Sequence, residues 1–165
     1  MYKDAVTLRA LHPDDMPFIE RLFAGSRSEE MSHSGWPAEQ IKNFLRQQFN
    51  AQHTYYQAHY ADGQFLIVEL DGQPIGRLYL FWGATTLNLI EICLLPEFQK
   101  RGIGSMLIEA QLYRADQLGL NVELFVEYYN PAQRLYARLG FYVCGDSGVY
   151  LKLRRDARVQ ARKVS

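Results

Sequence analysis

The hydrophobic residues of this chain follow two different periods, and each change of period predicts a new element. Alternation of apolar and polar positions predicts a strand, whereas apolar positions three and four residues apart predict a helix. These patterns predict strands at 5–11, 65–70, 74–82, 87–95, 122–126, 141–144 and 149–153, and helices at about 18–25, 38–52, 103–118 and 130–139. The order predicts an α/β (α+β) chain with a mixed, mostly antiparallel central sheet flanked by helices.

Turn residues between these segments support the same boundaries. Asp71-Gly72 is a hairpin signal, and Gly119 and Gly140 are placed to close helices. The polar stretch Ser26–Ser34 predicts a loop. Gly76 interrupts an apolar strand and therefore indicates a bulge.

The segment around which the chain is organised begins with the apolar strand Leu87–Leu95, in which Glu91 is the single charge. Pro96 cannot donate to a sheet ladder and is predicted to end this strand. The sequence Gln99-Lys-Arg-Gly-Ile-Gly104 then leads into a helix. The first turn of a helix offers unpaired N–H groups and a partial positive charge, and glycine lets an anion approach the backbone. The segment therefore predicts a pyrophosphate site, with a ligand-free glycine turn as the alternative.

Two other phosphate-binding motifs do not fit this loop. A P-loop needs Lys and then Ser or Thr directly after its last glycine, whereas Ser105 and Met106 follow Gly104. A dinucleotide-binding turn needs a third glycine three residues after the second, and Leu107 occupies that position. The sequence therefore favours a different pyrophosphate ligand.

Composition narrows the class of protein. The chain has 165 residues, of which 48% are apolar and 22% charged, as is typical of one globular domain. Lys plus Arg and Asp plus Glu number 18 each, which argues against general binding to nucleic acid or to a membrane surface. Cys93 and Cys144 make no disulfide framework. We find no signal peptide and no apolar run of about 18 residues, so we expect a reducing, cytoplasmic setting.

One domain is predicted over residues 1–165. The charged tail from Arg154 to Ser165 is predicted to be a frayed helix or a solvated terminus, with residues 156–165 disordered.

The run from Leu94 to Gly104, with Gln99, Gly102 and Gly104 at its key positions, resembles the acyl-CoA loop of the GNAT N-acetyltransferases. The predicted order of elements agrees with the GNAT fold over nearly the whole chain. The resemblance implies acetyl-CoA as the cosubstrate, with loop amides on the pyrophosphate of coenzyme A. The coenzyme A contacts it implies are Cys93, Leu94, Leu95, Gln99, Lys100, Arg101, Gly102, Ile103, Gly104, Ser105, Asn130 and Tyr136.

A second segment, Asn130 to Phe141, resembles the GNAT helix that carries a CoA-contacting Asn and a Tyr near the thioester sulfur. Tyr136 and the ending Gly140-Phe141 are in register with that motif. In a common form of the motif the Asn lies seven residues before the Tyr, and here Tyr129 holds that position. Two matching segments at the expected separation make the resemblance more specific than either alone.

Acetyl transfer from a thioester to an amine needs a base, an oxyanion donor and an acid. An alkyl ammonium has a pKa of about 10 and must lose a proton before it can attack. The thioester oxygen needs a fixed N–H donor, and the leaving thiolate needs a proton. The resemblance implies that the amide of Leu94 or a neighbour is the oxyanion donor and that Tyr136 is the acid. A core tyrosine on an amphipathic helix is the alternative for Tyr136.

For the base, the sequence offers Glu91, because desolvation in an apolar strand would raise its pKa toward neutrality. Glu127, at the end of the neighbouring strand, is its competitor. A structural ion pair of Glu91 with Arg77 or Arg9 is the alternative, and some family members use no dedicated side-chain base.

The acceptor is predicted to be a primary amine of a small molecule or a peptide, without further identification. The resemblance makes Trp36, Met31 and His33 candidates to contact it, although Trp36 alternatively packs against a helix end. Arg77 and the Tyr55-Tyr56 pair would suit an aromatic or acidic acceptor.

The remaining expectations concern metal binding, the alternative function and the oligomeric state. His53 and His59 lie among tyrosines without a second ligand cluster, so no metal is predicted, and an exposed helix end or an aromatic wall is expected there. The alternative function is a non-catalytic acyl-CoA-binding GNAT-fold sensor or interaction module. GNAT proteins are often homodimers, so the resemblance implies a homodimer as one assembly.

Overall fold

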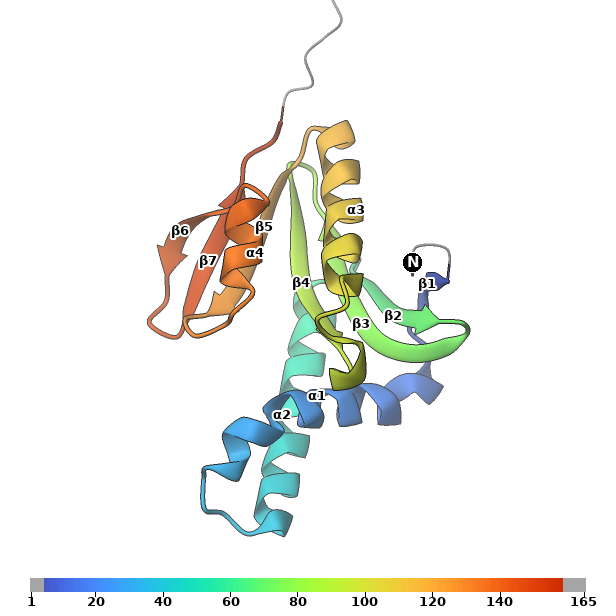
Figure 1. The fold of residues 1–165 in the computed structure, drawn as a ribbon, viewed down its shortest axis with the longest axis vertical. Coiled ribbons are helices and arrows are strands. Elements are labelled where there is room, and N and C mark those ends of the chain that lie inside the picture. Colours follow the sequence, from blue (N-terminus) through green and yellow to red (C-terminus); the bar gives the residue numbers. More distant parts are fainter. Residues whose placement is uncertain (1–4, 159–165) are drawn as a thin grey trace, which may run out of the picture. The chain divides into compact units, whose positions relative to one another are not determined.

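The computed structural model describes residues 5–158. Its elements are β1 (Val6–Ala10), α1 (Met16–Ser32), α2 (Ala38–His59), β2 (Gln64–Leu70), β3 (Gln73–Trp82), β4 (Thr86–Leu94), α3 (Ile103–Leu118), β5 (Asn121–Glu127), α4 (Gln133–Arg138), β6 (Tyr142–Asp146) and β7 (Tyr150–Arg155) (Figure 1). Short 3₁₀ turns at Pro13–Asp15 and Pro96–Phe98 precede α1 and follow β4. Within residues 5–158, no helix combines the length and the apolar character needed to cross a bilayer.

The strands form one seven-stranded sheet in the order β1-β2-β3-β4-β5-β7-β6. β1 pairs antiparallel with β2, and β7 pairs antiparallel with both β5 and β6. β4 and β5 are parallel, and the crossover connection that a parallel pair needs contains α3. The predicted mixed, mostly antiparallel sheet flanked by helices is therefore confirmed.

The chain divides into two compact units. The first unit comprises Met1–Tyr79 and Glu91–Arg101, and the second comprises Leu80–Ile90 and Gly102–Ser165. Strands β3 and β4 each contribute residues to both units. The single domain predicted over residues 1–165 stays a prediction.

The first unit has a core built from α1, α2 and β2. Ile19 and Phe23 of α1 meet Leu45 and Phe49 of α2 and Ile67 of β2 in one buried cluster. The rings of Phe23 and Phe49 are tilted, with centroids 5.7 Å apart. Each such side chain stabilises the fold by about 1.5–3 kcal/mol when it is fully buried. The three- and four-residue spacing that predicted the helices thus also marks their buried face.

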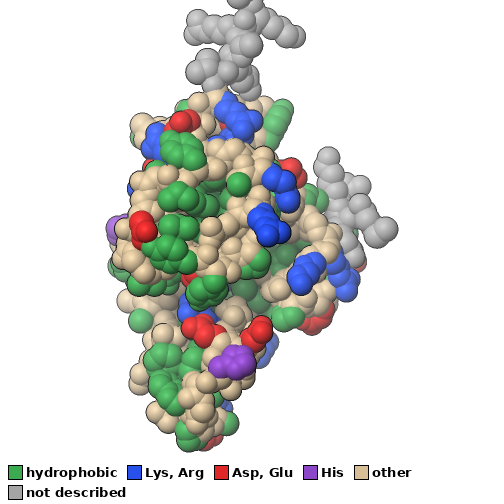
Figure 2. Space-filling model, turned by 60° about the vertical axis from the view of Figure 1, so that its left-hand side comes forward, with side chains coloured by type: hydrophobic (Ala, Val, Ile, Leu, Met, Phe, Trp, Pro, Cys, Tyr) green, Lys and Arg blue, Asp and Glu red, His purple; other side chains and the backbone are tan. Residues whose placement is uncertain are grey.

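The second unit is organised on α3, β5 and β7. Leu124 of β5 lies opposite Leu153 of β7, and both are buried. Phe125 and Tyr142 are instead about half exposed, at 57% and 46%. Figure 2 shows one face of the molecule, on which apolar side chains as well as Lys and Arg side chains are exposed. An exposed apolar side chain is ordinary for a soluble fold unless it belongs to a large contiguous patch.

Both N-terminal helices are longer than predicted. The loop expected at Ser26–Ser34 is wrong, because α1 continues to Ser32 and ends before Gly35, whose φ is +74°. The hydroxyls of Ser26, Ser28 and Ser32 donate to backbone carbonyls three residues earlier, which lets polar residues occupy a helix. α2 likewise continues past residue 52 to His59.

The C-terminal boundaries also differ from the prediction. Arg154 and Arg155 belong to β7 rather than to a frayed tail. Arg155 is buried, and its guanidinium donates to both Asp116 carboxylate oxygens at 2.7 and 3.0 Å and to the Leu139 carbonyl at 3.0 Å. A paired arginine can therefore be part of a strand that composition alone marks as solvated. The predicted disordered tail at 156–165 lies mostly outside the described residues.

Gly76 is explained by a close approach of two strands. A Cβ at this position would lie 2.3 Å from the Cys93 carbonyl oxygen and 3.1 Å from the Leu94 Cα. Only glycine lets the backbones of β3 and β4 come this close. The glycine that the sequence interpreted as a bulge therefore holds β4 against β3 beside Glu91.

Candidate active site

The end of β4 is fixed by two hydrogen bonds within the first unit. β4 ends at Leu94, and a 3₁₀ turn begins at Pro96, as the missing proline donor predicts. The Leu95 N–H donates to the Ile75 carbonyl at 2.8 Å. The Gln99 side-chain amide folds back and donates to the Leu94 carbonyl at 2.9 Å. Gln99 therefore shapes the loop after the strand.

Helix α3 begins without a side-chain cap. Gly102 is its N-cap, in the left-handed region with φ +83°, and no atom lies within 4 Å of the position a Cβ would take. The Met106 N–H donates to the Gly102 carbonyl at 3.0 Å, so the amides of Ile103, Gly104 and Ser105 precede this helical bond. These donors lie at the positive end of a 16-residue helix. A diphosphate therefore fits the groups present here.

Two cations precede Gly102 in the sequence. Lys100 is exposed and has φ +60°, a left-handed conformation uncommon for a residue with a side chain. The Arg101 guanidinium lies over the Phe98 ring, 5.7 Å from its centroid. Asp71, in the hairpin turn between β2 and β3, has a similar φ of +51°, so this conformation marks a tight turn of the chain.

Glu91 of β4 lies beside a buried arginine in the first unit. Arg77 of β3 is only 2% exposed, and its Nη2 lies 3.8 Å from Glu91 Oε2. The same Nη2 donates to the Gln52 side-chain oxygen at 3.0 Å, and the guanidinium lies over the Tyr79 ring at 5.0 Å. Burial lowers the pKa of Arg77, but the negative charge of Glu91 raises it, and the pKa lies above its ordinary value. The ion pair between Glu91 and Arg77 considered from the sequence is therefore present.

Sequence reasoning missed most of the cluster around Arg77. His53 Nδ1, Arg77 Nε and Nη1 and Tyr79 Oη are buried without a hydrogen-bond partner among the described residues. His53 is not an exposed helix end, because it is buried and stacks on Phe49 with ring centroids 5.7 Å apart. Burial, aided by the Arg77 charge, lowers the pKa of His53, and burial raises the pKa of Tyr79. The sequence feature that could have revealed this cluster is Arg77 itself, an arginine in the otherwise apolar strand 74–82.

Two residues considered with Glu91 in the sequence, Cys93 and Arg9, are a neutral thiol and an arginine with other ion-pair partners. Burial is the main cause that raises the pKa of the Cys93 thiol to about 11, so the group is protonated at neutral pH. Arg9 does not pair with Glu91. Its guanidinium donates to both Asp15 oxygens at 2.7 and 2.8 Å and to Glu69 at 2.8 Å.

Glu127 and Asn130 belong to one locally bonded loop in the second unit. The Asn130 side-chain oxygen accepts from the Ala132 N–H at 2.9 Å, and its amide donates to Glu127 Oε2 at 3.2 Å. Gln133 Nε2 donates to the backbone carbonyls of Glu127 and Tyr128 at 3.0 and 2.6 Å. The Asn130 side chain therefore shapes the start of α4, which begins at Gln133 rather than at 130–131.

Tyr136 is held in the interior of the second unit. It is 6% exposed, and its ring meets Phe141 edge to face with centroids 5.5 Å apart. The Phe141 N–H donates to the Tyr136 carbonyl at 3.0 Å, which fixes the two residues of the motif relative to one another. Burial of the ring against Phe141 is also what the alternative, a core tyrosine, predicts.

The candidate acceptor residues lie on α1, α2 and their connection. Trp36 is 41% exposed and packs edge-on against Phe44, as its alternative interpretation held. Met31 packs against the core of the first unit. Tyr55 is 57% exposed and stacks on His59, with ring centroids 5.1 Å apart. His33 follows the end of α1 and is exposed.

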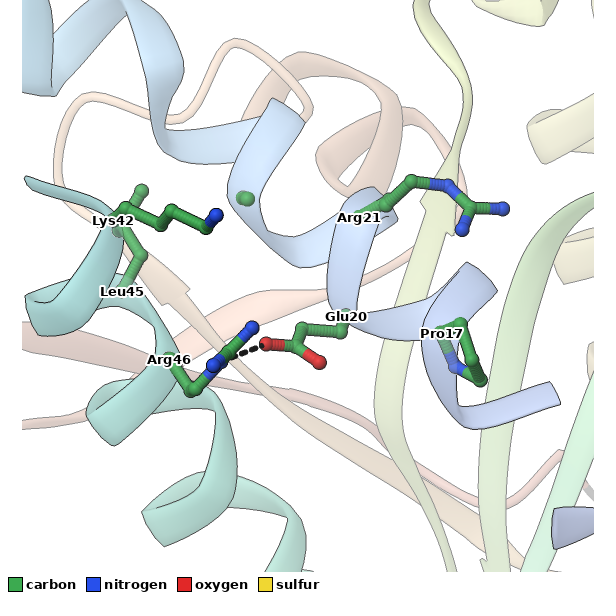
Figure 3. A pocket seen from close by; sticks show the side chains of 7 residues that line it. Pro17, Glu20, Arg21, Lys42, Leu45 and Arg46 are labelled. Carbon is green, nitrogen blue, oxygen red and sulfur yellow. Dashed lines mark hydrogen bonds and ion pairs between the residues drawn. The ribbon is translucent and has the colours of Figure 1, made fainter. Parts of the chain in front are cut away.

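A hollow of about 310 Å³ lies between α1 and α2. It is lined by Pro17, Glu20, Arg21, Ala24, Lys42, Leu45 and Arg46 (Figure 3). Arg46 reaches across it to Glu20 at 2.9 Å. None of the residues predicted to bind coenzyme A lines it. Within residues 5–158, no three His, Cys, Asp or Glu side chains are grouped as a metal site would require.

Comparison with known proteins shows which proteins share this fold and which family the sequence matches. The crystal structure of PaiA N-acetyltransferase from Thermoplasma acidophilum in complex with coenzyme A is similar over 92% of this chain and 98% of that chain, with a TM-score of 0.67 and 21% identity. An acetyltransferase from Thermus thermophilus is similar over 94% and 99%, with a TM-score of 0.66 and 22% identity. At these identities the likeness shows the fold.

At the level of sequence, an N-alpha-acetyltransferase of Sulfurisphaera tokodaii is 26% identical over 98 residues. The match covers 48% of this chain and only 57% of the relative's length. The model of the Acetyltransferase (GNAT) family matches residues 29–141, which include both segments on which the resemblance rested. The chain belongs to the GNAT acetyltransferase family.

Proposed function

We propose that this chain transfers the acetyl group of acetyl-CoA to a primary amine of a small molecule or a peptide, by direct attack in a ternary complex. The observation that carries the proposal is the start of α3, where a left-handed Gly102 is followed by the first-turn amides of Ile103, Gly104 and Ser105. These are the groups that a pyrophosphate needs. A similar fold is found with coenzyme A in the Thermoplasma acidophilum protein.

In the proposed reaction, the amine nitrogen attacks the thioester carbonyl carbon, the carbon–sulfur bond breaks, and coenzyme A leaves as the thiol. Glu91 takes the proton that the amine must lose. Tyr136 donates a proton to the departing sulfur. The amide of Leu94, or of its neighbour Cys93, donates to the carbonyl oxygen as it becomes negative. The Leu95 N–H is excluded from this role because it donates to the Ile75 carbonyl.

The proposed coenzyme A contacts are the loop Gln99–Ser105 and Tyr136, and Asn130 supports them indirectly. Gln99 acts by shaping the loop, since its side-chain amide is bonded to the Leu94 carbonyl. Lys100 and Arg101 add positive charge for the phosphates. Asn130 contributes through the turn that it stabilises before α4. Glu127 is the competing base, and its bond from Asn130 makes it the weaker candidate.

Coenzyme A binding tests the proposed pyrophosphate site with two matched glycine variants. Gly102 and Gly119 flank α3, with φ +83° and +68°, and neither has an atom within 4 Å of an added Cβ. Alanine therefore imposes similar backbone strain at both positions. We expect calorimetry to show at least about a tenfold loss of coenzyme A affinity for Gly102→Ala, and little change for Gly119→Ala. Equal affinities in the two variants would contradict the proposed site.

Turnover is tested by release of the coenzyme A thiol with a panel of amines. The panel includes peptides with a free α-amino group, because of the N-alpha-acetyltransferase relative, together with polyamines, amino acids and aminoglycosides. We expect acceptor-dependent thiol release, and mass spectrometry should show an added acetyl group on the amine. Tight coenzyme A binding with no turnover on any amine would favour a non-catalytic acyl-CoA-binding module. A cytoplasmic location and a homodimer stay predictions.

A further inference from the structure

Arg77 places a full positive charge in the interior of the first unit. It is among the largest fully buried side chains of the described chain, at 2% exposure. A buried charge is costly unless it is paired and hydrogen-bonded. Arg77 Nε and Nη1 nevertheless have no hydrogen-bond partner among the described residues. A hydrophobic residue would fill this position at lower cost, so the arginine calls for a role other than stability.

The contacts that Arg77 does make all fix the direction of its guanidinium. Nη2 donates to Gln52 of α2 at 3.0 Å, and the planar group lies over the Tyr79 ring at 5.0 Å. Nη2 is also the atom that approaches Glu91 Oε2, at 3.8 Å. The Glu91 side chain is 25% exposed, so it reaches solvent while the arginine does not. The pair therefore has one buried, fixed member and one accessible member.

We propose that Arg77 is a positioning residue for Glu91, and that its guanidinium, oriented by Gln52 and Tyr79, holds the Glu91 carboxylate ionised and in one orientation. The inference rests on the proposed function, in which Glu91 takes the proton of the amine. A base must be deprotonated before it can accept that proton, and a cation within about 4–6 Å favours the charged form of a carboxylate. Arg77 thus offsets the desolvation that an apolar strand imposes on Glu91.

Several other titratable or charged groups lie near the Arg77–Glu91 pair. They are Tyr79 of β3, Cys93 of β4, His53 of α2, Arg27 of α1, which acts on Cys93, and Asp15, which acts on Tyr79 and is paired with Arg9. Of the groups on β3, only Arg77 carries a charge at pH 7. Burial raises the pKa of Tyr79 and that of Cys93, so both are neutral at pH 7. Burial, together with the Arg77 charge, lowers the pKa of His53, so this ring is neutral as well.

The direct test is an NMR titration of the Glu91 carboxyl carbon, assigned by its loss in Glu91→Gln. We expect Arg77→Gln to raise the pKa of Glu91 by about one unit or more, and Arg77→Lys to raise it less because the charge remains. Gln52→Glu leaves the cavity filled and puts a competing carboxylate on Arg77 Nη2, so it should also raise the pKa of Glu91. An unchanged pKa in both Arg77→Gln and Gln52→Glu would overturn the proposal.

The kinetic test is the pH profile of kcat/KM for the same variants. We expect the acid limb in Arg77→Gln to move to higher pH. At a pH below the limb, the rate should fall about tenfold for each pH unit by which the limb moves. Arg77→Lys should restore part of this loss. A merely structural role would lower activity at every pH and leave the limb in place, and that result would contradict the proposal.

Arg9→Gln is the matched control. It breaks ion pairs with Asp15 and Glu69 in the same unit, and these two carboxylates, rather than Glu91, are the partners of Arg9. We expect this variant to lose stability and to keep both the Glu91 titration and the acid limb unchanged. If the wild-type protein acetylates no amine, the proposed function falls, while the NMR titration still decides the role of Arg77.

Discussion

The two candidate bases, Glu91 and Glu127, have surroundings that differ in kind. Glu91 faces Arg77, which lies fourteen positions away in the sequence and is held by Gln52 of α2. Glu127 is bonded to Asn130, only three residues further along. Tertiary packing therefore sets the environment of the first carboxylate, whereas a local turn sets that of the second.

This difference is the reason why we propose Glu91, rather than Glu127, as the base. The loop around Glu127 is explained by turn formation alone, because Asn130 and Gln133 bond to backbone groups within six residues. The cluster around Glu91 is not explained by stability, because it leaves donors of a buried arginine without partners among the described residues. Unsatisfied buried groups beside an accessible carboxylate are typical of functional sites.

The largest expected effect separates the two carboxylates directly. Glu91→Gln removes a general base without changing the size of the side chain, so we expect kcat/KM to fall by about 10²–10⁴. Glu127→Gln should cost about tenfold or less, because the loop keeps its backbone bonds. Thiol release under saturating acetyl-CoA measures both. A greater loss in Glu127→Gln would exchange the two assignments.

The next effect concerns the strand that carries Glu91. Gly76→Ala puts a methyl group 2.3 Å from the Cys93 carbonyl oxygen, so β3 and β4 must separate. We expect the free energy of unfolding to fall by about 1–3 kcal/mol in urea denaturation. Gly25→Ala is the control, since no atom lies within 4 Å of its added Cβ and alanine is the better helix residue. Equal stability of the two variants would show that β3 and β4 tolerate the separation.

The third effect concerns the Arg9–Asp15 ion pair, whose contribution to the free energy of unfolding depends on pH. Hydrogen bonds from Arg9 lower the pKa of Asp15 from 3.8 to about 2. This carboxylate therefore contributes stability that is present above about pH 4 and is lost as the pH falls toward about 2. Because Arg9 is partly exposed, we expect a contribution of about 1–2 kcal/mol. Asp15→Asn should be less stable than wild type at pH 7, and the difference should shrink at about pH 2.5. A constant difference would contradict the assignment.

The smallest effect tests whether the Glu127 loop is structural. Asn130→Ala removes the acceptor for the Ala132 N–H and the donor to Glu127. We expect a loss of about 1 kcal/mol in the free energy of unfolding and faster hydrogen exchange in α4. Asn130→Asp keeps the acceptor and should recover most of the stability. If Asn130→Ala instead weakened coenzyme A binding with stability unchanged, Asn130 would be a ligand contact rather than a turn residue.

The sequence by itself determined the order of elements, the end of β4 before Pro96, the glycine loop before α3 and the family. These features depend on residues near one another in the chain, where periodicity, missing donors and left-handed glycines act locally. Residues 26–32 were wrongly assigned to a loop because serine is neutral to unfavourable in helix interiors, and the prediction could not include the bonds to carbonyls three residues back.

Only the tertiary structure decided what surrounds each carboxylate and which cations are buried. Arg77 is buried under α2, Arg155 is paired with Asp116, and Arg9 is bonded to Asp15 and Glu69 rather than to Glu91. The reason is physical: the charge state and orientation of a side chain depend on distances to groups that folding brings together from distant parts of the chain. A sequence pattern carries no such distances.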